Sequence, residues 1–196
     1  MRLPVVIFLL LCMIVSCTAT VFADNTIIVD QIGDNNSFTL EQKDATNNYI
    51  RIRTGTISNV DYTLFSVLQQ GTGNKIADFE IKSGINNNVT TIQDGTGNHK
   101  ASIIAFNGSG NNISVNQSGA GNHEFKVDNW NNSVNNGNTI TATQSGGVGA
   151  DKWFAVNLNG ATGASVSVIQ NNPTTPDQAS MLIQCNPCGS YSYVRN

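Results

Sequence analysis

Apolar and polar residues alternate along most of this chain, and the alternation returns at a fixed interval. In the clearest stretch, residues 65–136, three consecutive segments of 24 residues align without gaps. They read FSVLQQGTGNKIADFEIKSGINNN (65–88), VTTIQDGTGNHKASIIAFNGSGNN (89–112) and ISVNQSGAGNHEFKVDNWNNSVNN (113–136). A repeat period of roughly 20–50 residues is typical of stacked architectures.

Each segment contains two short runs that we predict to be strands. In the first run, apolar or β-branched residues occupy every second position, in the columns that begin at Phe65 and Val67. In the second run, the columns that begin at Ala77, Phe79 and Ile81 are mostly apolar, and the positions between them are mostly charged or polar. Such one-sided alternation predicts a strand with one buried face.

Turn residues separate the two runs. Gly-x-Gly-Asn begins at Gly71, Gly95 and Gly119, and paired asparagines such as 87–88 mark a second corner. Glycine and asparagine tolerate the backbone angles of tight turns. Two short strands cannot bury their apolar face alone, so units of strand, turn, strand and turn should stack. The sequence therefore predicts an all-β fold, a β-solenoid of six to seven layers with about 24 residues in each.

Stacking in register would place identical side chains above one another. Identical primary amides can then hydrogen-bond along the column, because each carries both a donor and an acceptor. The predicted ladder positions are Gln31, Gln69, Gln93, Gln117 and Gln144, then Asn36, Asn74, Asn98 and Asn122, with Gly33, Gly71, Gly95 and Gly119 at the turns.

The motif Gln-x-Gly-x-x-Asn followed by an alternating strand resembles the curlin repeat, the unit of curli fibres. The matches are residues 31–36, 69–74, 93–98 and 117–122, while 144–146 keeps only the first half. Lys82, Phe106 and Trp130 stand where the second glutamine of the repeat would be. The resemblance implies a secreted amyloid subunit of cell-surface fibres, with roles in adhesion and biofilm matrix. It also implies other curlin-like subunits and an outer-membrane secretion channel as partners.

Residues 1–23 are predicted to be a secretory signal peptide. An apolar run over residues 4–15 precedes small residues suited to cleavage after Ala23. Alternatively, residues 14–17 resemble a lipobox, in which Cys17 would be lipidated. Both readings take the protein out of the cytoplasm, and no later run is long enough for a membrane-spanning helix. We divide the remainder into the solenoid, residues 24–184, and a C-terminal tail, residues 185–196.

The composition favours amide-rich sheets. The chain has 28 asparagines against 10 lysines and arginines, and its formal net charge is −3. No basic patch is evident, so nucleic acid is not an expected partner. Arg51 and Arg53 share one face of an alternating run, which is either solvated or a contact for an anionic surface polymer.

Two clusters could carry chemistry. Cys185 and Cys188 could be a redox pair, half of a zinc site, or a local disulfide that pins the tail, and the expected oxidising compartment favours the disulfide. His99 and His123 share a column with Lys75 and are either a metal-binding pair or, as we expect, solvated turn residues. Trp130 and Trp153, on alternating runs, are expected to pack rather than to act as adhesive aromatics.

An enzyme is not predicted. Polysaccharide-cleaving solenoids gather several carboxylates on one face for acid–base chemistry. Here no column holds three acids, since the candidates are scattered at Asp78, Glu80, Asp94, Glu124 and Asp128. No cofactor or metal site is expected.

A non-polymerising extracellular solenoid that binds carbohydrate, ice or a surface is the alternative function. Ice binding would require a flat threonine face, and Thr72, Thr90, Thr91 and Thr96 do not form a continuous ladder. By contrast, the N-terminal edge of the stack should template another chain, since the repeat starts soon after residue 23. The proline-containing loop 171–178 and the cysteine pair would blunt the C-terminal edge.

Overall fold

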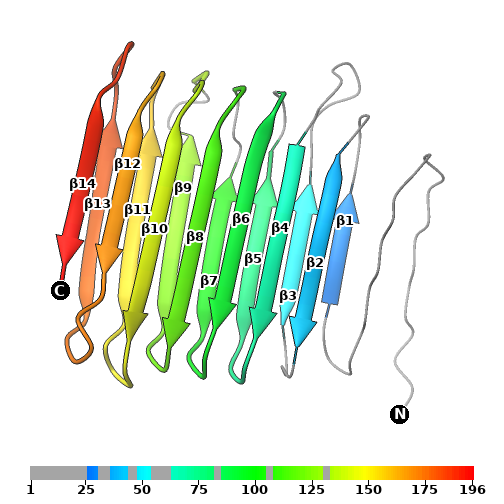
Figure 1. Cartoon of the computed structure of the whole chain (residues 1–196), viewed down its shortest axis with the longest axis vertical. Coiled ribbons are helices and arrows are strands. Elements are labelled where there is room, and N and C mark those ends of the chain that lie inside the picture. The colour runs from blue at the N-terminus through cyan, green and yellow to red at the C-terminus, as the bar shows by residue number, and fades with distance from the viewer. Residues whose placement is uncertain are drawn as a thin grey trace.

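The computed structural model describes residues 26–30, 36–43, 48–53, 63–81, 85–104, 108–129 and 133–196, and in these residues the fold is all-β. Two parallel seven-stranded sheets face each other (Figure 1). The odd sheet runs β1 (Thr26–Asp30), β3 (Tyr49–Arg53), β5 (Lys75–Glu80), β7 (His99–Ile104), β9 (His123–Asn129), β11 (Lys152–Leu158) and β13 (Asp177–Ile183). The even sheet runs β2 (Ser37–Lys43), β4 (Thr63–Gln70), β6 (Asn87–Asp94), β8 (Asn112–Gly119), β10 (Thr139–Gly146), β12 (Ser165–Gln170) and β14 (Ser190–Arg195).

The chain crosses between the two sheets after every strand, and each strand pairs in parallel with the strand two places earlier. One even strand and the next odd strand make a coil, so β2 to β13 form six coils, with β1 and β14 as half-coils at the ends. The predicted β-solenoid is confirmed. The strict interval of 24 residues joins β4, β6 and β8, whereas neighbouring coils are offset by 26 or 27 residues.

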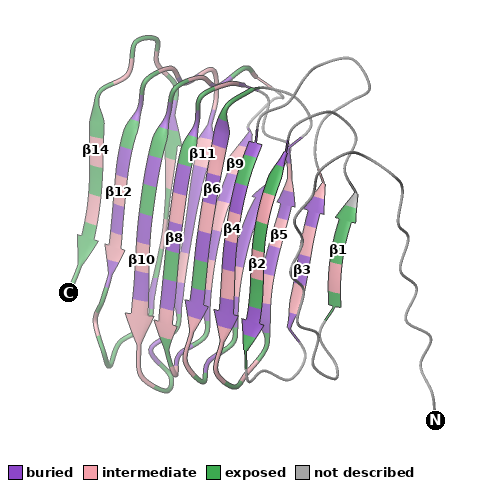
Figure 2. Cartoon of the chain, turned by 45° about the vertical axis from the view of Figure 1, so that its right-hand side comes forward, coloured by how far each residue is buried: buried purple, intermediate pink, exposed green. Residues whose placement is uncertain are grey.

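The core lies between the sheets, where alternate residues of both sheets meet (Figure 2). Phe65, Phe79, Phe125 and Phe154 are fully buried there. Their aromatic contacts run along the stack as well as across it. Phe125 and Phe154 lie in adjacent odd strands with ring centroids 6.3 Å apart, and Phe65 meets Phe79 of the opposite sheet at 5.8 Å. Period-two burial is what the sequence alternation predicts for a two-layer stack.

The C-terminal segment, which we predicted to be a tail, contributes a strand of its own. β14 pairs with β12 as the seventh strand of the even sheet, and Tyr191 and Tyr193 pack against the core. The inward side chains of β14 therefore extend the core of the solenoid. The predicted leader with Cys17, together with Gln31, Gly33, Lys82, Phe106 and Trp130, lies outside the described residues.

Candidate functional site

A glutamine ladder runs through the interior of the even sheet. Each Nε2 donates to the Oε1 of the glutamine one coil later, at 2.8–2.9 Å throughout. All of these side chains are at most 4% exposed. The members are Gln42, Gln69, Gln93, Gln117, Gln144 and Gln170.

In the ladder glutamines from Gln69 onward, the amide also donates to a backbone carbonyl of the other sheet. Gln93 Nε2 donates to the carbonyl of Ile76 at 2.8 Å, and Gln117 Nε2 to that of Lys100 at 2.9 Å. Both amide protons are therefore used without water, and the ladder ties the sheets together as well as the coils. All of its links point the same way, from the N-terminal coil toward the C-terminal coil.

Among the described residues, the glutamine ladder ends at Gln170, which donates to a carboxylate instead of another glutamine. Gln170 Nε2 donates to Asp177 Oδ2 at 2.9 Å, and the Tyr193 hydroxyl donates to both oxygens of that carboxylate, at 2.8 and 3.0 Å. Burial and the bond to Asp177 raise the pKa of Tyr193, which therefore stays a neutral donor at pH 7. In β14 the register partner of Gln170 is Arg195.

Two predicted ladder positions differ from the structure. Gln42, rather than Gln31, is the register partner of Gln69, because the strand that precedes Gln31, β1, belongs to the odd sheet. Asn36 lies at the second corner, where its Oδ1 accepts from the backbone N–H of Thr63 at 3.1 Å. The sequence does contain the signal for Gln42 and Gln170, since both end alternating apolar runs. The spacing rule built on Gly-x-Gly-Asn passes over them, because neither is followed by that motif.

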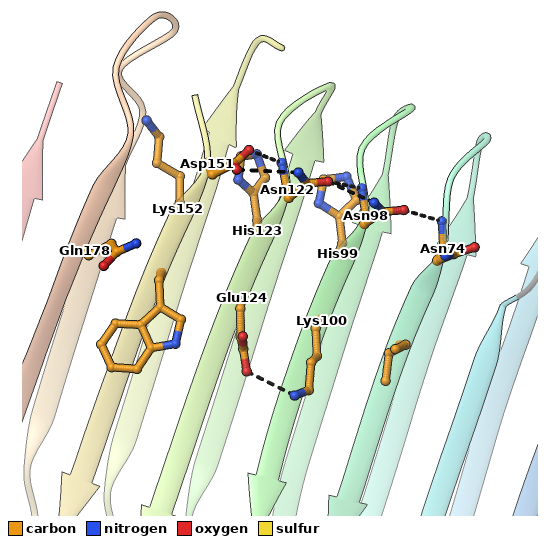
Figure 3. Close-up of a pocket in the computed structure, with 12 residues that line it drawn as sticks. Asn74, Asn98, His99, Lys100, Asn122, His123, Glu124, Asp151, Lys152 and Gln178 are labelled. Atoms are coloured by element: carbon orange, nitrogen blue, oxygen red, sulfur yellow. Dashed lines mark hydrogen bonds and ion pairs between the residues drawn. The ribbon is translucent and has the colours of Figure 1, made fainter. Parts of the chain in front are cut away.

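The predicted asparagine column forms the first corner (Figure 3). The backbone N–H of Asn74 donates to Asn98 Oδ1 at 2.9 Å, and Asn98 Nδ2 donates to Asn122 Oδ1 at 2.9 Å. Asp151 continues the column, accepting from the backbone N–H of Asn122 at 2.8 Å. These side chains satisfy turn N–H groups of the preceding coil, so each corner fixes the position of the next.

A second asparagine ladder, which the sequence reasoning did not identify, is buried at the opposite corner. Asn111 Nδ2 donates to Asn87 Oδ1 at 3.0 Å, and Asn138 Nδ2 donates to Asn111 Oδ1 at 3.1 Å. These links point toward the N-terminal coil, opposite to those of the glutamine ladder. In the sequence the paired asparagines indicate only a turn, although one member of each pair faces inward.

Behind the first corner lies a buried column of basic side chains, which we call the basic column: Lys75, His99, His123 and Lys152. The two histidines are 1% and 2% exposed and their rings lie 5.0 Å apart, so the prediction that they are solvated is wrong. The parity of their strands turns them inward, where the Gly-x-Gly turn leaves room beside the backbone. Lys75 Nζ donates to the carbonyls of Thr72, Gly95 and Gly97 at 2.7, 3.0 and 2.8 Å.

Burial sets the protonation of the basic column. Desolvation lowers the pKa of Lys75 to about 8, against the opposing effect of Asp94. Desolvation, with the nearby Lys75 and His123, lowers the pKa of His99 to about 3. Desolvation also lowers the pKa values of His123 and Lys152. Both histidines are therefore neutral at pH 7. Within the described residues no three His, Cys, Asp or Glu side chains are grouped as metal ligands would be.

The outward face of the odd sheet carries mixed charges. Lys100 Nζ lies 3.0 Å from Glu124 Oε1 at the rim of a shallow groove (Figure 3). Arg51 is in register with Asp78, and Arg53 with Glu80, so each arginine has an acid beside it in the next coil. Such a face does not concentrate positive charge toward an anionic polymer. Trp153 is only partly buried at the same groove.

The remaining candidates are the cysteines. Cys185 and Cys188 form a disulfide that closes the turn before β14. The turn supports the end of the stack, since the backbone N–H of Cys188 donates to the carbonyl of Thr162 at 2.7 Å.

In comparisons with protein-family models, curated proteins and solved structures, no match to this chain was found. The part of the chain that the structure describes contains no helix that could cross a lipid bilayer.

Proposed function

We propose that this chain is a non-enzymatic structural protein of the extracellular space that assembles end to end into fibres. Each copy would add its coils to the stack of the previous one, as the resemblance to curlin repeats implies. The assembled fibre would serve the cell surface in adhesion and biofilm matrix, and the leader over residues 1–23 would take the chain there.

The observation that carries this proposal is the apolar character of both ends of the stack. At the N-terminal end, Ile27, Phe38 and Leu40 are core-facing but only partly buried. At the C-terminal end, Met181 and Tyr191 also face the core and are only partly buried. Soluble solenoids usually cover their terminal coils with polar capping elements. Among the described residues, no strand pairs with the outer edges of β1, β2, β13 or β14.

The strand order supports a continuous junction. The first described strand, β1, lies in the odd sheet and the last, β14, in the even sheet, so β1 and β2 of a second copy can follow β13 and β14 without altering the alternation. Extending the observed columns would place Phe38 of the second copy over Tyr191, and Leu40 over Tyr193. Apolar columns would then run through the junction unbroken.

The glutamine ladder also supports this junction. Arg195 occupies the ladder column in the last strand, and Gln42 occupies it in the first even strand. Every ladder link donates toward the C-terminal side, so the Oε1 of Gln42 is an acceptor that faces the N-terminal side. An arginine can only donate. The guanidinium of Arg195 therefore matches the Oε1 of Gln42 of the next copy.

The test is assembly of the chain without residues 1–23. We expect thioflavin-positive fibres whose diffraction has a meridional spacing near 4.7 Å. Arg195→Glu should suppress elongation, because a carboxylate would meet the Gln42 acceptor, whereas Arg195→Gln should retain it. Ser180→Glu, on the exposed outward side of the neighbouring terminal strand β13, is the matched control. Protein that stays monomeric for days, with no thioflavin response, would contradict the proposal.

One observation favours a second candidate, a non-polymerising binding solenoid. Asp177 already accepts from the last amide of the ladder within the chain, and Tyr193 donates to that carboxylate. A chain closed in this way at its C-terminal end would remain a monomer or terminate a fibre. Sedimentation of the purified protein at several concentrations distinguishes the two candidates.

A further inference from the structure

The outward side of the even sheet, which we call the hydroxyl face, carries an unbroken column of hydroxyl residues. Figure 2 shows this sheet toward the viewer, with its strands nearly parallel. The column contains one serine or threonine from every even strand, and all are exposed or half-buried. They are Thr39, Ser66, Thr90, Ser114, Thr141, Ser167 and Ser192. The threonines considered from the sequence were mostly in other columns, which is why a continuous ladder was not expected.

The hydroxyl face is nearly uncharged. In the strands β4, β6, β8, β10, β12 and β14, all of which are described, the only ionisable outward side chain is Asp94. In β2, Lys43 and Glu41 pair with each other at 2.7 Å. The column beside the hydroxyls holds asparagine, serine, threonine and Leu64. The column on the other side mixes apolar residues such as Ile92 with polar ones such as Asn116 and Thr143. The odd sheet, by contrast, presents acids and bases on its outward side.

We propose that the hydroxyl face packs against the same face of a second copy of this chain. A second copy necessarily has the same strand spacing, so its columns of side chains stay in step along the whole stack. Small serine, threonine and asparagine side chains allow two sheets to approach to about 10 Å. Almost no charge has to be desolvated, whereas pairing through the odd sheet would bury many charged groups.

The size of the face suits such a contact. The seven even strands are six to eight residues long, and at about 4.8 Å between strands and about 3.3 Å per residue they give roughly 800 Å² per copy, similar to the ~800 Å² per partner of a stable interface. Leu64, Ile92 and Val194 are 45%, 37% and 54% exposed, and the contact would remove them from water. The same patch on both partners makes the contact isologous, so it closes as a pair.

This side-by-side pairing uses a different surface from end-to-end stacking and does not depend on it. A soluble chain would form a dimer through the hydroxyl face, and a fibre would contain two stacks in its cross-section. Failure of fibre formation therefore leaves the pairing testable.

The test compares the native chain with the double variant Thr90→Lys, Ser114→Lys, which would place like charges opposite each other in the middle of the contact. Analytical ultracentrifugation measures the soluble species, and mass per length by electron microscopy measures any fibres. We expect the variant to have half the native mass in both measurements. The control double variant, Asn157→Lys with Ser180→Lys, changes outward positions of the odd sheet and should keep the native mass. Circular dichroism checks that both variants fold.

Three results would overturn the pairing. One is a native protein that is monomeric in solution and has one stack per fibre. Another is a Thr90→Lys, Ser114→Lys variant that keeps the native mass. The third is a native monomer that binds a neutral polysaccharide, with the binding lost in this variant alone, which would assign the hydroxyl face to a glycan ligand.

Discussion

Gln93 and Gln117 are joined by a hydrogen bond of 2.9 Å between side chains that lie 24 residues apart in sequence. The same Nε2 of Gln93 also donates to the carbonyl of Ile76, in the opposite sheet, at 2.8 Å. One amide thus links two coils and two sheets. Both amide protons are used in a buried position. A residue without two donors therefore cannot replace this side chain without leaving buried acceptors unpaired.

Replacing Gln93 with glutamate should destabilise the fold at neutral pH. A carboxylate would keep the bond accepted from Gln69 but lose both donors, so a buried negative charge would face the Oε1 of Gln117 and the carbonyl of Ile76. We expect the free energy of unfolding to fall by about 3 kcal/mol or more in denaturant titration. The loss should shrink at acid pH, where the carboxyl is protonated.

The matched control is Gln178→Glu, the same change at an exposed outward position of β13 in the odd sheet. Its effect should remain within about 0.5 kcal/mol, since it changes a surface position. Equal losses for the two variants would contradict the ladder. In assembly experiments, glutamate at Gln69, Gln93 and Gln117 together should slow fibre growth strongly.

The buried His99 should make the fold sensitive to acid. Its pKa is about 3 in the folded chain and 6.5 for a free histidine. Between these values the unfolded chain binds more protons, so stability is full above pH 6.5 and is lost as the pH falls toward 3. His99→Gln should flatten this dependence in unfolding experiments from pH 7 to pH 4. Lys100→Gln, the outward neighbour, should retain the native slope, and a slope unchanged in His99→Gln would exclude this histidine as a source.

Lys75 should make the stability of the fold depend on pH in the alkaline range. Its pKa is lowered from 10.5 to about 8, so between these values the unfolded chain binds more protons and stability rises with pH. Lys75→Met should reduce that rise, while Lys152, whose pKa is also lowered by burial, continues to contribute. It should also cost about 1–3 kcal/mol at pH 7, because the carbonyls of Gly95 and Gly97 lose their donor. Thermal unfolding followed from pH 7 to pH 10.5 measures both effects. An alkaline rise undiminished in the variant would show that other groups cause it.

The turn at Gly95 should tolerate no side chain. Its φ is +102°, and a Cβ there would collide with the carbonyl oxygen of Gly119 in the next coil. We expect Gly95→Ala to lower the free energy of unfolding by at least about 2 kcal/mol. Gly149→Ala is the control, because its φ is +78° with open space around it. A larger loss of stability in Gly95→Ala than in Gly149→Ala would measure how closely the turns stack. Equal losses would mean that backbone strain alone explains both.

The stacked fold could be predicted from the sequence because its signals are local and repeated. Alternation identifies a strand with one buried face, Gly-x-Gly-Asn identifies the turn, and the interval of 24 residues between Gln69, Gln93 and Gln117 fixes which strands lie over each other. Identical amides at a constant interval leave little freedom, since a shift by one residue would turn every apolar side chain to the wrong face.

Membership of the columns outside that strict stretch was decided by the tertiary structure. Coil lengths of 26 and 27 residues hide the correspondence of Gln42 and Gln170 with the other glutamines, and only the pairing of strands shows it. The motif at Gln31 matches the repeat, yet the strand before it lies in the other sheet.

Burial at the corners and the ends of the stack was likewise decided in three dimensions. His99 follows a turn in sequence, where solvation is the ordinary expectation, but the next coil covers it. β14 carries too little repeat signal to be recognised, and it is a strand because β12 offers it an edge. A periodic sequence determines the shape of one coil, and contact between coils determines which side chains are enclosed.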